Sequence, residues 1–496
     1  MSQQPSTTAL DLNNIQGDIL TGIPKKTQTY FFFAITDVKL FRSQLAHLVP
    51  LIKTTSQALD DRKKIDDHKK KGNKTLIKMV GVNIAFSHKG FKKLEIDDTT
   101  LRDERFREGQ KQGAKDLLDK GTESGSDFVP NWEPEFLQDI HAVILISGDS
   151  HETVGKKFDE VKSSFGISPA HQQNLASIKE VTTIRGDVRP GKESGREHFG
   201  FLDGISNPSV IGFDNNPIPG TRPVRAGVVV TGHEGDPNLS PRPTWTMDGS
   251  YLTFRYLFQQ VPEFNKFLAD NPIPLPGLTP KEGSELLGAR LMGRWKSGAP
   301  IDLSPFQDDP ELAKDPKRVN NFRYQAEGTF QKMCPFAAHI RKTNPRADLE
   351  DFFGINAIEN NRIVRRGVQF GPELTKDEIV SNKTAHARGL LFVCYSSSIE
   401  NGFAFIQRSK QCSFETLINS EVAGNQVWAN SANFPPNAGV DAGLDPIIGQ
   451  GKRTMVGTDP NNPDKELSLP DFVIPRGGEY FFSPSIKSLK EALATA

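Results

Sequence analysis

Apolar runs and helical stripes alternate along the N-terminal part of the chain. Thr29–Ile35 (TYFFFAI) is a continuous apolar run typical of a strand. Met79–Phe86 alternates as a strand does, and Ile140–Ser147 and Ser177–Ile184 also predict strands. Two stretches carry apolar residues at the spacing of one helical face: Val38, Phe41, Leu45 and Leu48 in the first, and Val154, Phe158, Val161 and Phe165 in the second. The resulting order, β-α-β-β-α-β, is that of a ferredoxin-like unit.

The same order recurs, less regularly, after a loop-like stretch rich in Gly, Pro and Arg at Arg185–Gly220. We expect strands at Tyr251–Phe258, Arg362–Phe370, Gly389–Tyr395 and Glu479–Phe482, and helices at Val261–Ala269, Lys281–Trp295 and Ile399–Gln411. This second assignment draws partly on the resemblance described below. The 496 residues are long for one core but sufficient for two domains. The pattern predicts an α+β protein of two ferredoxin-like units with facing sheets, divided into residues 1–190 and 191–496.

Composition and charge narrow the classes of partner. Hydrophobic residues make up 36% of the chain and charged residues 25%, which describes an ordinary globular protein. The 61 Lys and Arg residues balance the 61 Asp and Glu residues, so no net charge attracts nucleic acid or an anionic membrane. The one conspicuous charged run, Asp60–Lys74, mixes both signs. We interpret it as a solvated connection, with a binding patch as the alternative.

Cysteines and apolar runs exclude two further classes of protein. The three cysteines are odd in number and lack CxxC spacing, so neither a disulfide framework nor a structural zinc site is expected. No apolar run approaches the roughly 20 residues of a membrane helix. The first residues, MSQQPSTTALDLNNIQ, contain no basic stretch followed by an apolar segment, as a secretory signal would. The expectation is an intracellular protein or a mature form whose signal has been removed.

Asp203 is the first candidate for chemistry. It lies in Glu197–Pro208 (EHFGFLDGISNP), where Gly200 and Gly204 permit tight backbone turns and close approach of a flat ligand. Its apolar neighbours destabilise the ionised carboxylate, which helps the group pass protons in both directions. The alternative is a turn in which the carboxylate caps local amides.

His339 and Arg365 are the other two candidates. His339 lies in Met333–Arg346 (MCPFAAHIRKTNPR) without the second His or the carboxylate pair that zinc or non-haem iron requires. Haem needs only one protein ligand, although a lone His is more often a hydrogen-bonded core residue. Arg365 lies in Arg362–Gly371 (RIVRRGVQFG), where a buried guanidinium can stabilise a developing oxyanion. Surface arginines on an edge strand are the alternative.

The strand Gly389–Tyr395 (GLLFVCY) places Leu390, Phe392 and Cys394 on one face. Such a face has two interpretations: it packs in the hydrophobic core, or it forms a water-free wall beside a reactive centre.

Taken in order, these segments resemble the dye-decolorising peroxidases, particularly their fungal branch. The matching segments are EHFGFLDGISNP, CPFAAHIRKTNPR, RIVRRGVQFG, GLLFVCY and PRGGEYFFSPS (Pro475–Ser485), and the opening NIQGDIL (Asn14–Leu20) followed by Phe31–Phe33 is also similar. The resemblance therefore extends over nearly the whole chain. It implies a dimeric α+β barrel made of the two ferredoxin-like units, with one haem b per chain in the C-terminal unit.

The resemblance also implies roles for individual residues. Asp203 would be the distal acid–base catalyst with Arg365 beside it, and His339 the axial ligand of the iron. Leu390 and Phe392 would cover the distal face of the haem. Asp445 (GLDPIIG) is the candidate carboxylate behind the His339 ring, with Asp441 as the alternative. Arg341 and Arg346 are candidate partners of a haem propionate.

The activity implied is reduction of hydrogen peroxide and oxidation of dyes, phenols and other aromatic donors through a ferryl/porphyrin-radical intermediate. Phe370 stands where a redox-active tyrosine can occur in such proteins, and phenylalanine is not readily oxidised. Trp428 is therefore the candidate electron relay, with a packed indole as the alternative. The protein is expected to be a monomer or homodimer without nucleic-acid or membrane partners. The resemblance implies an extracellular location, with a cytoplasmic one as the alternative.

Two other functions stay open at the level of sequence. One is a haem-binding protein that carries haem or releases its iron, with incidental peroxidase activity. The other is a haem-free structural or regulatory protein. Asp203 and Arg365 favour peroxide cleavage over the first, because a carrier needs only His339.

Overall fold

The strands of the N-terminal half form an antiparallel sheet in the order β2-β5-β1-β6. The computed structural model describes residues 9–125, 127–167, 176–240, 242–324, 331–353, 355–407, 444–451 and 453–495. The elements of this unit are β1 (Thr27–Ile35), α1 (Val38–Leu48), α2 (Thr55–Lys70), β2 (Val80–Phe86), β5 (Ala142–Gly148), α5 (His151–Ser164) and β6 (Ile178–Asp187). The predicted ferredoxin-like order is therefore confirmed for this half.

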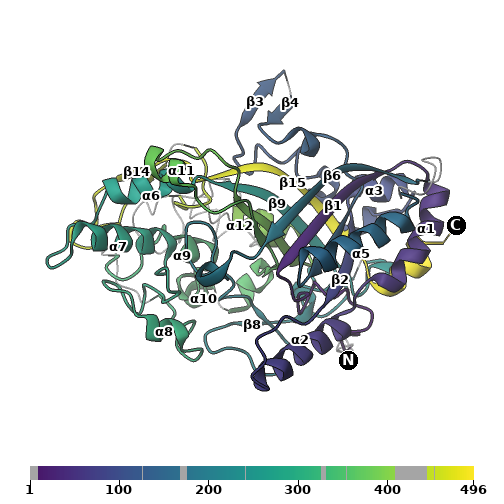
Figure 1. Ribbon diagram of the computed structural model, residues 1–496, viewed down its shortest axis with the longest axis horizontal. Coiled ribbons are helices and arrows are strands. Elements are labelled where there is room, and N and C mark those ends of the chain that lie inside the picture. Colours follow the sequence, from purple (N-terminus) through teal and green to yellow (C-terminus); the bar gives the residue numbers. More distant parts are fainter. Residues whose placement is uncertain are drawn as a thin grey trace.

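Strand β1 shows why this half folds as it does. Successive side chains of a strand point to opposite faces, and here both faces are apolar. Phe31 and Phe33 pack with residues of α1 and α5, whereas Tyr30 and Phe32 pack in a second core with residues of the C-terminal half. Helix α1 begins at Asp37, whose side chain accepts a hydrogen bond from the Leu40 N–H. Helices α1 and α5 therefore cover one face only, as Figure 1 shows.

The C-terminal half repeats this sheet. Its strands have the order β10-β12-β9-β15, with β11 also paired to β12, and all of these pairs are antiparallel. Its elements are β9 (Ser250–Gln259), α6 (Val261–Asp270), α7 (Pro280–Met292), α9 (His339–Thr343), β10 (Val364–Arg365), β11 (Val368–Phe370), α11 (Lys376–Ser381), β12 (Gly389–Ser396) and β15 (Val473–Ser483). In both halves the first strand is flanked by the third and the fourth.

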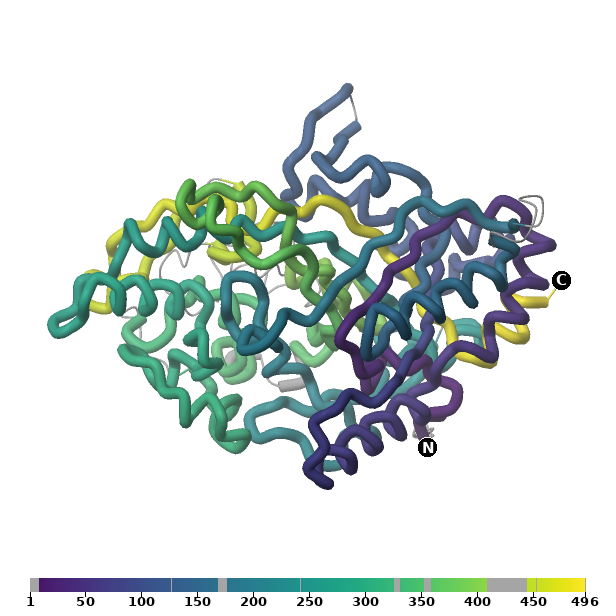
Figure 2. The backbone as a smooth tube through the Cα atoms, viewed as in Figure 1, coloured from purple at the N-terminus to yellow at the C-terminus, as the bar shows by residue number. Residues whose placement is uncertain are grey.

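The two sheets meet at their edge strands and enclose one core. Phe482 of β15 pairs with Phe86 of β2, which joins the halves into a single sheet. At the opposite edges, Gly186 of β6 lies so close to β11 that an added Cβ would be 2.4 Å from a Val368 methyl carbon. The inward faces of both sheets contribute to the same core, so the facing arrangement predicted from the sequence is confirmed. Figure 2 shows the C-terminal segment in yellow crossing from the helix-rich part towards the chain end beside α1.

Three elements differ from the sequence expectations. The charged run expected to be a solvated connection begins inside helix α2, which a capping box of Thr54 and Gln57 starts. That prediction was wrong because a narrow buried face, which includes Ala58 and Asp61, is enough to hold this helix against the protein. Its other residues are largely charged and show no helical pattern of apolar positions. The strand expected over Arg362–Phe370 is interrupted between β10 and β11. Of the helix expected over Ile399–Gln411, the structure describes a π-helical turn and α12 (Phe405–Gln407), and the rest lies outside the described residues.

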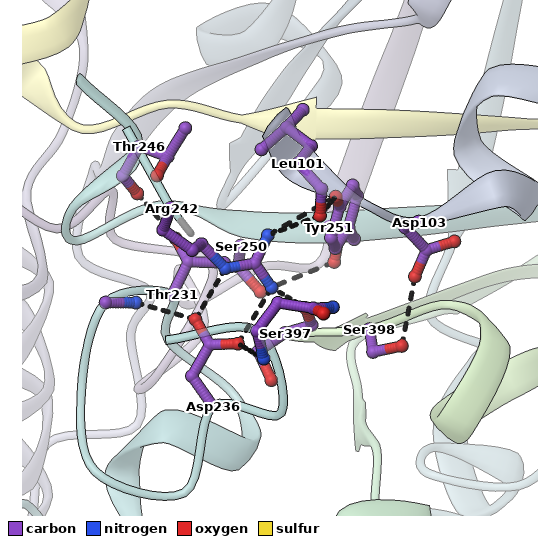
Figure 3. A network of polar contacts seen from close by, with 12 residues as sticks. Leu101, Asp103, Thr231, Asp236, Arg242, Thr246, Ser250, Tyr251, Ser397 and Ser398 are labelled. Carbon is purple, nitrogen blue, oxygen red and sulfur yellow. Dashed lines mark hydrogen bonds and ion pairs between the residues drawn. The ribbon is translucent and has the colours of Figure 1, made fainter. Parts of the chain in front are cut away.

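A buried polar network fastens the connection between β8 (Pro223–Val224) and β9. Arg242 donates two hydrogen bonds to the Asp236 carboxylate and another to the Ser397 carbonyl, and its side chain is 2% exposed. Nearby, Asp103 accepts a hydrogen bond from the Ser398 hydroxyl (Figure 3) and another from the Ile399 N–H. These bonds tie the connection to the end of β12.

No helix in the described part of the chain combines the length and the apolar character needed to cross a membrane.

Candidate active site

A cavity of about 510 Å³ lies between the C-terminal sheet and helices α7 and α9. Strands β9, β12 and β15 supply one wall, and the loop after β6 supplies another. Asp203, His339 and Arg365, three side chains far apart in the sequence, all line it. The volume lies within the range of roughly 300–1,000 Å³ that is usual for cofactor and ligand sites.

Asp203, in the loop after β6, and Arg365, in β10, form an ion pair at the surface of the cavity. Arg365 Nη1 donates to Asp203 Oδ1 at 2.6 Å, and the Arg365 backbone N–H donates to Asn207 Oδ1 at 3.0 Å. Burial raises the pKa of the Asp203 carboxyl, but the charge and hydrogen bond of Arg365 outweigh burial, so the pKa lies below its ordinary value. The charge of Asp203 raises the pKa of Arg365. The pair is therefore ionised, and about a third of each side chain is exposed (32% and 30%).

Two glycines and a glutamate shape the loop that carries Asp203. Gly200 and Gly204 have φ values of +96° and +78°, which other residues adopt at a cost. The Gly204 N–H donates to Asp203 Oδ1 at 2.6 Å. The Glu197 carboxylate accepts the N–H groups of Phe199 and Phe201, each at 2.8 Å. Glu197 was not predicted from the sequence, although it begins the motif that carries Asp203.

His339 begins helix α9 and is oriented by Asp445. Its Nδ1–H donates to Asp445 Oδ2 at 2.8 Å, and Asp445 Oδ1 accepts the backbone N–H groups of Ile447 and Ile448. Burial lowers the pKa of His339, but Asp445 raises it above its ordinary value. Burial raises the pKa of Asp445, and His339 and the two N–H groups lower it below its ordinary value. With Nδ1 engaged in this way, Nε2 is the nitrogen left for a ligand of the cavity.

The remaining cavity wall is apolar in one part and cationic in another. Leu390 and Phe392 line it from β12, as expected for side chains on one face of a strand. The cationic part contains Arg294, Arg346 and Arg362. Burial lowers the pKa of each of these guanidinium groups, to about 10 for Arg294 and Arg362. The wall therefore offers a dry surface at one place and buried positive charge at another.

The predicted propionate partner Arg341 is not part of this wall. Its guanidinium donates to both carboxylate oxygens of Asp348, at 2.7 and 2.8 Å, and it lies over the ring of Phe336. The cavity-lining residues include Arg346 but not Arg341, because the Asp348 pair holds the Arg341 side chain elsewhere. Arg294, which no sequence motif indicated, also lines the cavity.

Two predicted residues lie outside the described part of the chain: the candidate relay Trp428 and the alternative carboxylate Asp441.

Comparisons with known proteins agree along the whole chain. Residues 14–190 match a family model described as the DyP dimeric alpha+beta barrel domain, and residues 194–415 match the C-terminal model of Dyp-type peroxidases. The dye-decolorizing peroxidase of Mycena epipterygia is 40% identical, over 98% of this chain and 88% of that protein.

Solved structures agree with these matches. A mutant of the dye-decolorizing peroxidase from Pleurotus ostreatus has a TM-score of 0.91 at 52% identity, covering 98% of this chain and 100% of that chain. A dye-decolorizing peroxidase in complex with 2,6-dimethoxyphenol has a TM-score of 0.83 at 40% identity, with the same coverage.

Proposed function

The chain belongs to the dye-decolorising peroxidase family, and from that premise we propose that His339 holds the iron of one haem b while Asp203 and Arg365 act on peroxide. The protein is a peroxidase of this type, and membership of the family implies haem. The observation that carries the assignment of residues is geometric. Asp203, Arg365 and His339 line one cavity, and Asp445 holds the His339 ring by a hydrogen bond.

Three properties of the cavity support haem as its occupant. Its volume of about 510 Å³ suits a cofactor of that size class. The Nε2 nitrogen of His339, whose ring is held by the Asp445 carboxylate, would hold the iron. Buried guanidinium groups at Arg294 and Arg346 suit the carboxylates of the macrocycle. When bound, the haem would supply the iron that binds peroxide and the two electrons that its reduction requires.

In the proposed mechanism Asp203 moves the proton. Its ionised carboxylate accepts a proton from the near oxygen of hydrogen peroxide and returns it to the far oxygen, which leaves as water. Arg365 stabilises the negative charge on the leaving oxygen as the O–O bond breaks. Asp445 keeps Nδ1 of His339 hydrogen-bonded, so that Nε2 remains a strong donor to the metal. The apolar side chains of Leu390 and Phe392 would limit the access of water to the cavity.

We propose dyes, phenols and other aromatic donors as the reductants, each giving one electron. A related peroxidase solved with 2,6-dimethoxyphenol supports a phenolic donor. Donors too large for the cavity would react at the protein surface, with Trp428 as the proposed relay. A monomeric or homodimeric state and an extracellular location remain predictions. Analytical ultracentrifugation tests the first, and mass spectrometry of the native N-terminus tests the second.

The alternative is a haem carrier or iron-releasing protein with incidental peroxidase activity. Such a protein needs His339 to hold the haem but does not need the Asp203–Arg365 ion pair. The retained Asp203–Arg365 pair and the nearly full-length similarity to peroxidases favour the peroxidase.

Replacing Asp203 by asparagine tests the mechanism. The amide side chain of this variant would keep the shape and a hydrogen-bond acceptor for Arg365 but could not take up the proton. We expect the rate constant for reaction with peroxide to fall by about 10²–10⁴-fold with haem content unchanged, measured by stopped-flow absorption and pyridine haemochrome assay. Asp139→Asn is the matched control, because the Asp139 side chain is 70% exposed at the surface.

Full activity of Asp203→Asn would refute the proposed role of the carboxylate. In His339→Ala, haem content should fall, and an unchanged axial ligand in the resonance Raman spectrum would show that another residue binds the iron.

A further inference from the structure

Tyr324 is a buried residue whose hydroxyl is unpaired within the described part of the chain. Its side chain lines the cavity, although the residue is only 3% exposed. The hydroxyl oxygen is buried and has no hydrogen-bond partner among the described residues. A buried polar group left unpaired destabilises the fold, so native proteins rarely keep one without a ligand or function. The position of this hydroxyl therefore indicates an acceptor that enters the cavity.

Packing holds the Tyr324 ring in place. The guanidinium of Arg341 lies 4.8 Å from the ring centre, and the Phe322 ring packs against it at 5.3 Å. Tyr324 has a φ of +60°, which is uncommon for a residue with a side chain, and its N–H donates to Asp302 Oδ2 at 3.3 Å. The ring is thus fixed at one place on the wall, and its hydroxyl is pre-positioned.

The charges beside Tyr324 indicate what the acceptor is. Arg294 donates to the carbonyls of Gly298 and Val319 and to the Asn320 side chain, all neutral groups. Arg346 likewise donates to neutral oxygens, including the carbonyls of Asn320 and Phe322. Both guanidinium groups line the cavity.

The neighbouring arginines differ from these two in their partners. Arg341 pairs with Asp348, while Arg222 and Arg362 pair with Glu350. Burial lowers the pKa of Arg346, although the charges of its acidic neighbours Glu350 and Asp302 act to raise it. The Asp302 carboxylate accepts a hydrogen bond from the Tyr324 N–H. No ion pair neutralises Arg294 or Arg346 within the described part of the chain, which leaves them suited to an anionic ligand group.

We propose that Tyr324, together with Arg294 and Arg346, forms a carboxylate subsite in which the tyrosine hydroxyl donates a hydrogen bond to a carboxylate of the bound haem. The positive charges of the two guanidinium groups attract the carboxylate, and the hydrogen bond from the tyrosine hydroxyl fixes its orientation. The subsite replaces Arg341 as a determinant of haem binding. It rests on the proposed function, because it requires haem in this cavity.

The test compares haem release from the wild type and from Tyr324→Phe, which removes one oxygen and keeps the ring. Holoprotein is mixed with excess apomyoglobin, and transfer is followed by absorption. We expect release from Tyr324→Phe to be about tenfold faster or more, since a hydrogen bond to a charged group is lost. The control is Tyr256→Phe, because Tyr256 is not among the cavity-lining residues and packs against Phe370 instead.

A second probe identifies the acceptor. Both proteins are reconstituted with haem dimethyl ester, in which the carboxylates are uncharged. The difference between wild type and Tyr324→Phe should then shrink to about twofold or less, because a neutral acceptor gains less from the hydroxyl. In the resonance Raman spectrum of the haem-loaded proteins, the propionate bending band should shift in Tyr324→Phe but not in Tyr256→Phe.

Equal release from wild type and Tyr324→Phe would overturn the subsite, and so would a tenfold difference that persists with the ester. Either result would leave the proposed function intact if the wild type retains haem through His339. A wild type that takes up no haem would refute the proposed function and the subsite together.

Discussion

The ion pair of Asp203 and Arg365 determines the pH range in which the carboxylate is charged. Burial acts to raise the pKa of Asp203, and Arg365 more than offsets burial through its charge and its hydrogen bond. Because the pKa of Asp203 lies below its ordinary value, the proton acceptor remains ionised at acidic pH. The Gly204 N–H and the charge of His339 also lower the pKa of Asp203, but Arg365 contributes most, so the acid side of the rate profile should depend mainly on the ion pair.

Arg365→Leu should therefore move the acid limb of the peroxide reaction to higher pH. Without the guanidinium only burial and the remaining hydrogen bonds act on Asp203, so its pKa rises and protonation removes activity sooner on acidification. The measurement is the second-order rate constant for peroxide across the acidic and neutral pH range, and Arg365→Lys should lie between the two. An acid limb at the same pH in all three proteins would show that another group controls it.

The second residue pair makes a different prediction. Asp445 accepts one hydrogen bond from His339 and two from backbone N–H groups, so its orientation is fixed. Asp445→Asn removes the charge and presents an amide to Nδ1–H. We expect activity or haem affinity to fall by about 10–100-fold, and the iron–histidine stretching band of the reduced protein to move to lower frequency. An unchanged band would mean that His339 does not depend on Asp445.

At the scale of elements, the start of strand β12 depends on a buried ion pair with helix α11. Arg388 donates to both oxygens of Glu378, at 2.9 and 2.6 Å, and both side chains are 0% exposed. The Arg388 carbonyl also accepts the Gln259 N–H, where β12 begins to pair with β9. The strand that carries Leu390 and Phe392 is therefore anchored by Arg388, the residue just before it begins.

Glu378→Gln should lower the free energy of unfolding by about 3–5 kcal/mol at neutral pH, because it leaves a buried guanidinium without its counter-ion. The hydrogen bond from Arg388 lowers the pKa of Glu378 in the folded protein, so the pair stabilises the fold above the ordinary value of 4.5. That contribution is lost as pH falls towards the lower folded value. Urea midpoints at neutral and at strongly acidic pH should differ more for wild type than for the variant, and Lys376→Gln on the same helix is the control.

At the scale of the whole molecule, the C-terminal strand β15 unites the two halves. It pairs with β9 over its length and meets β2 through Phe482 and Phe86. The Gln16 side chain donates to the carbonyls of Ile84 and Pro484, which ties the beginning of the chain to its end. A boundary between residues 190 and 191 would divide the sequence into two units, and these contacts cross it. We propose that the two units are structural repeats that do not fold independently.

Expression of residues 1–190 alone tests this proposal. The fragment would expose the β2 edge and the apolar face of β1 that normally packs against the other half. We expect it to aggregate or to lack a cooperative thermal transition, and co-expression with residues 191–496 should restore one transition, measured by circular dichroism. A fragment that melts cooperatively as a monomer would show two independent domains.

The sequence by itself determined the local elements and the types of chemical group in the cavity. The β1 strand, the α1 stripe and the α+β order of the first half follow from periodicity, since a periodic pattern records which face of an element is buried, whereas the repeat in the second half rested partly on the family resemblance. Helix α2 was missed because its buried face is narrow and its charges resemble those of a solvated segment. The motifs carrying Asp203, His339 and Arg365 also identified the family before any geometry was known.

Only the tertiary structure decided which groups meet. Arg341 pairs with Asp348 and does not line the cavity, whereas Arg346 donates to the carbonyls of Asn320 and Phe322 and does line it. The roles of Glu197, Arg294 and Tyr324 likewise follow from burial and partners that no local pattern records. Periodicity describes one element at a time, whereas a site is assembled from several elements by long-range packing. The sequence therefore specified the reactive side chains, and the fold specified their partners.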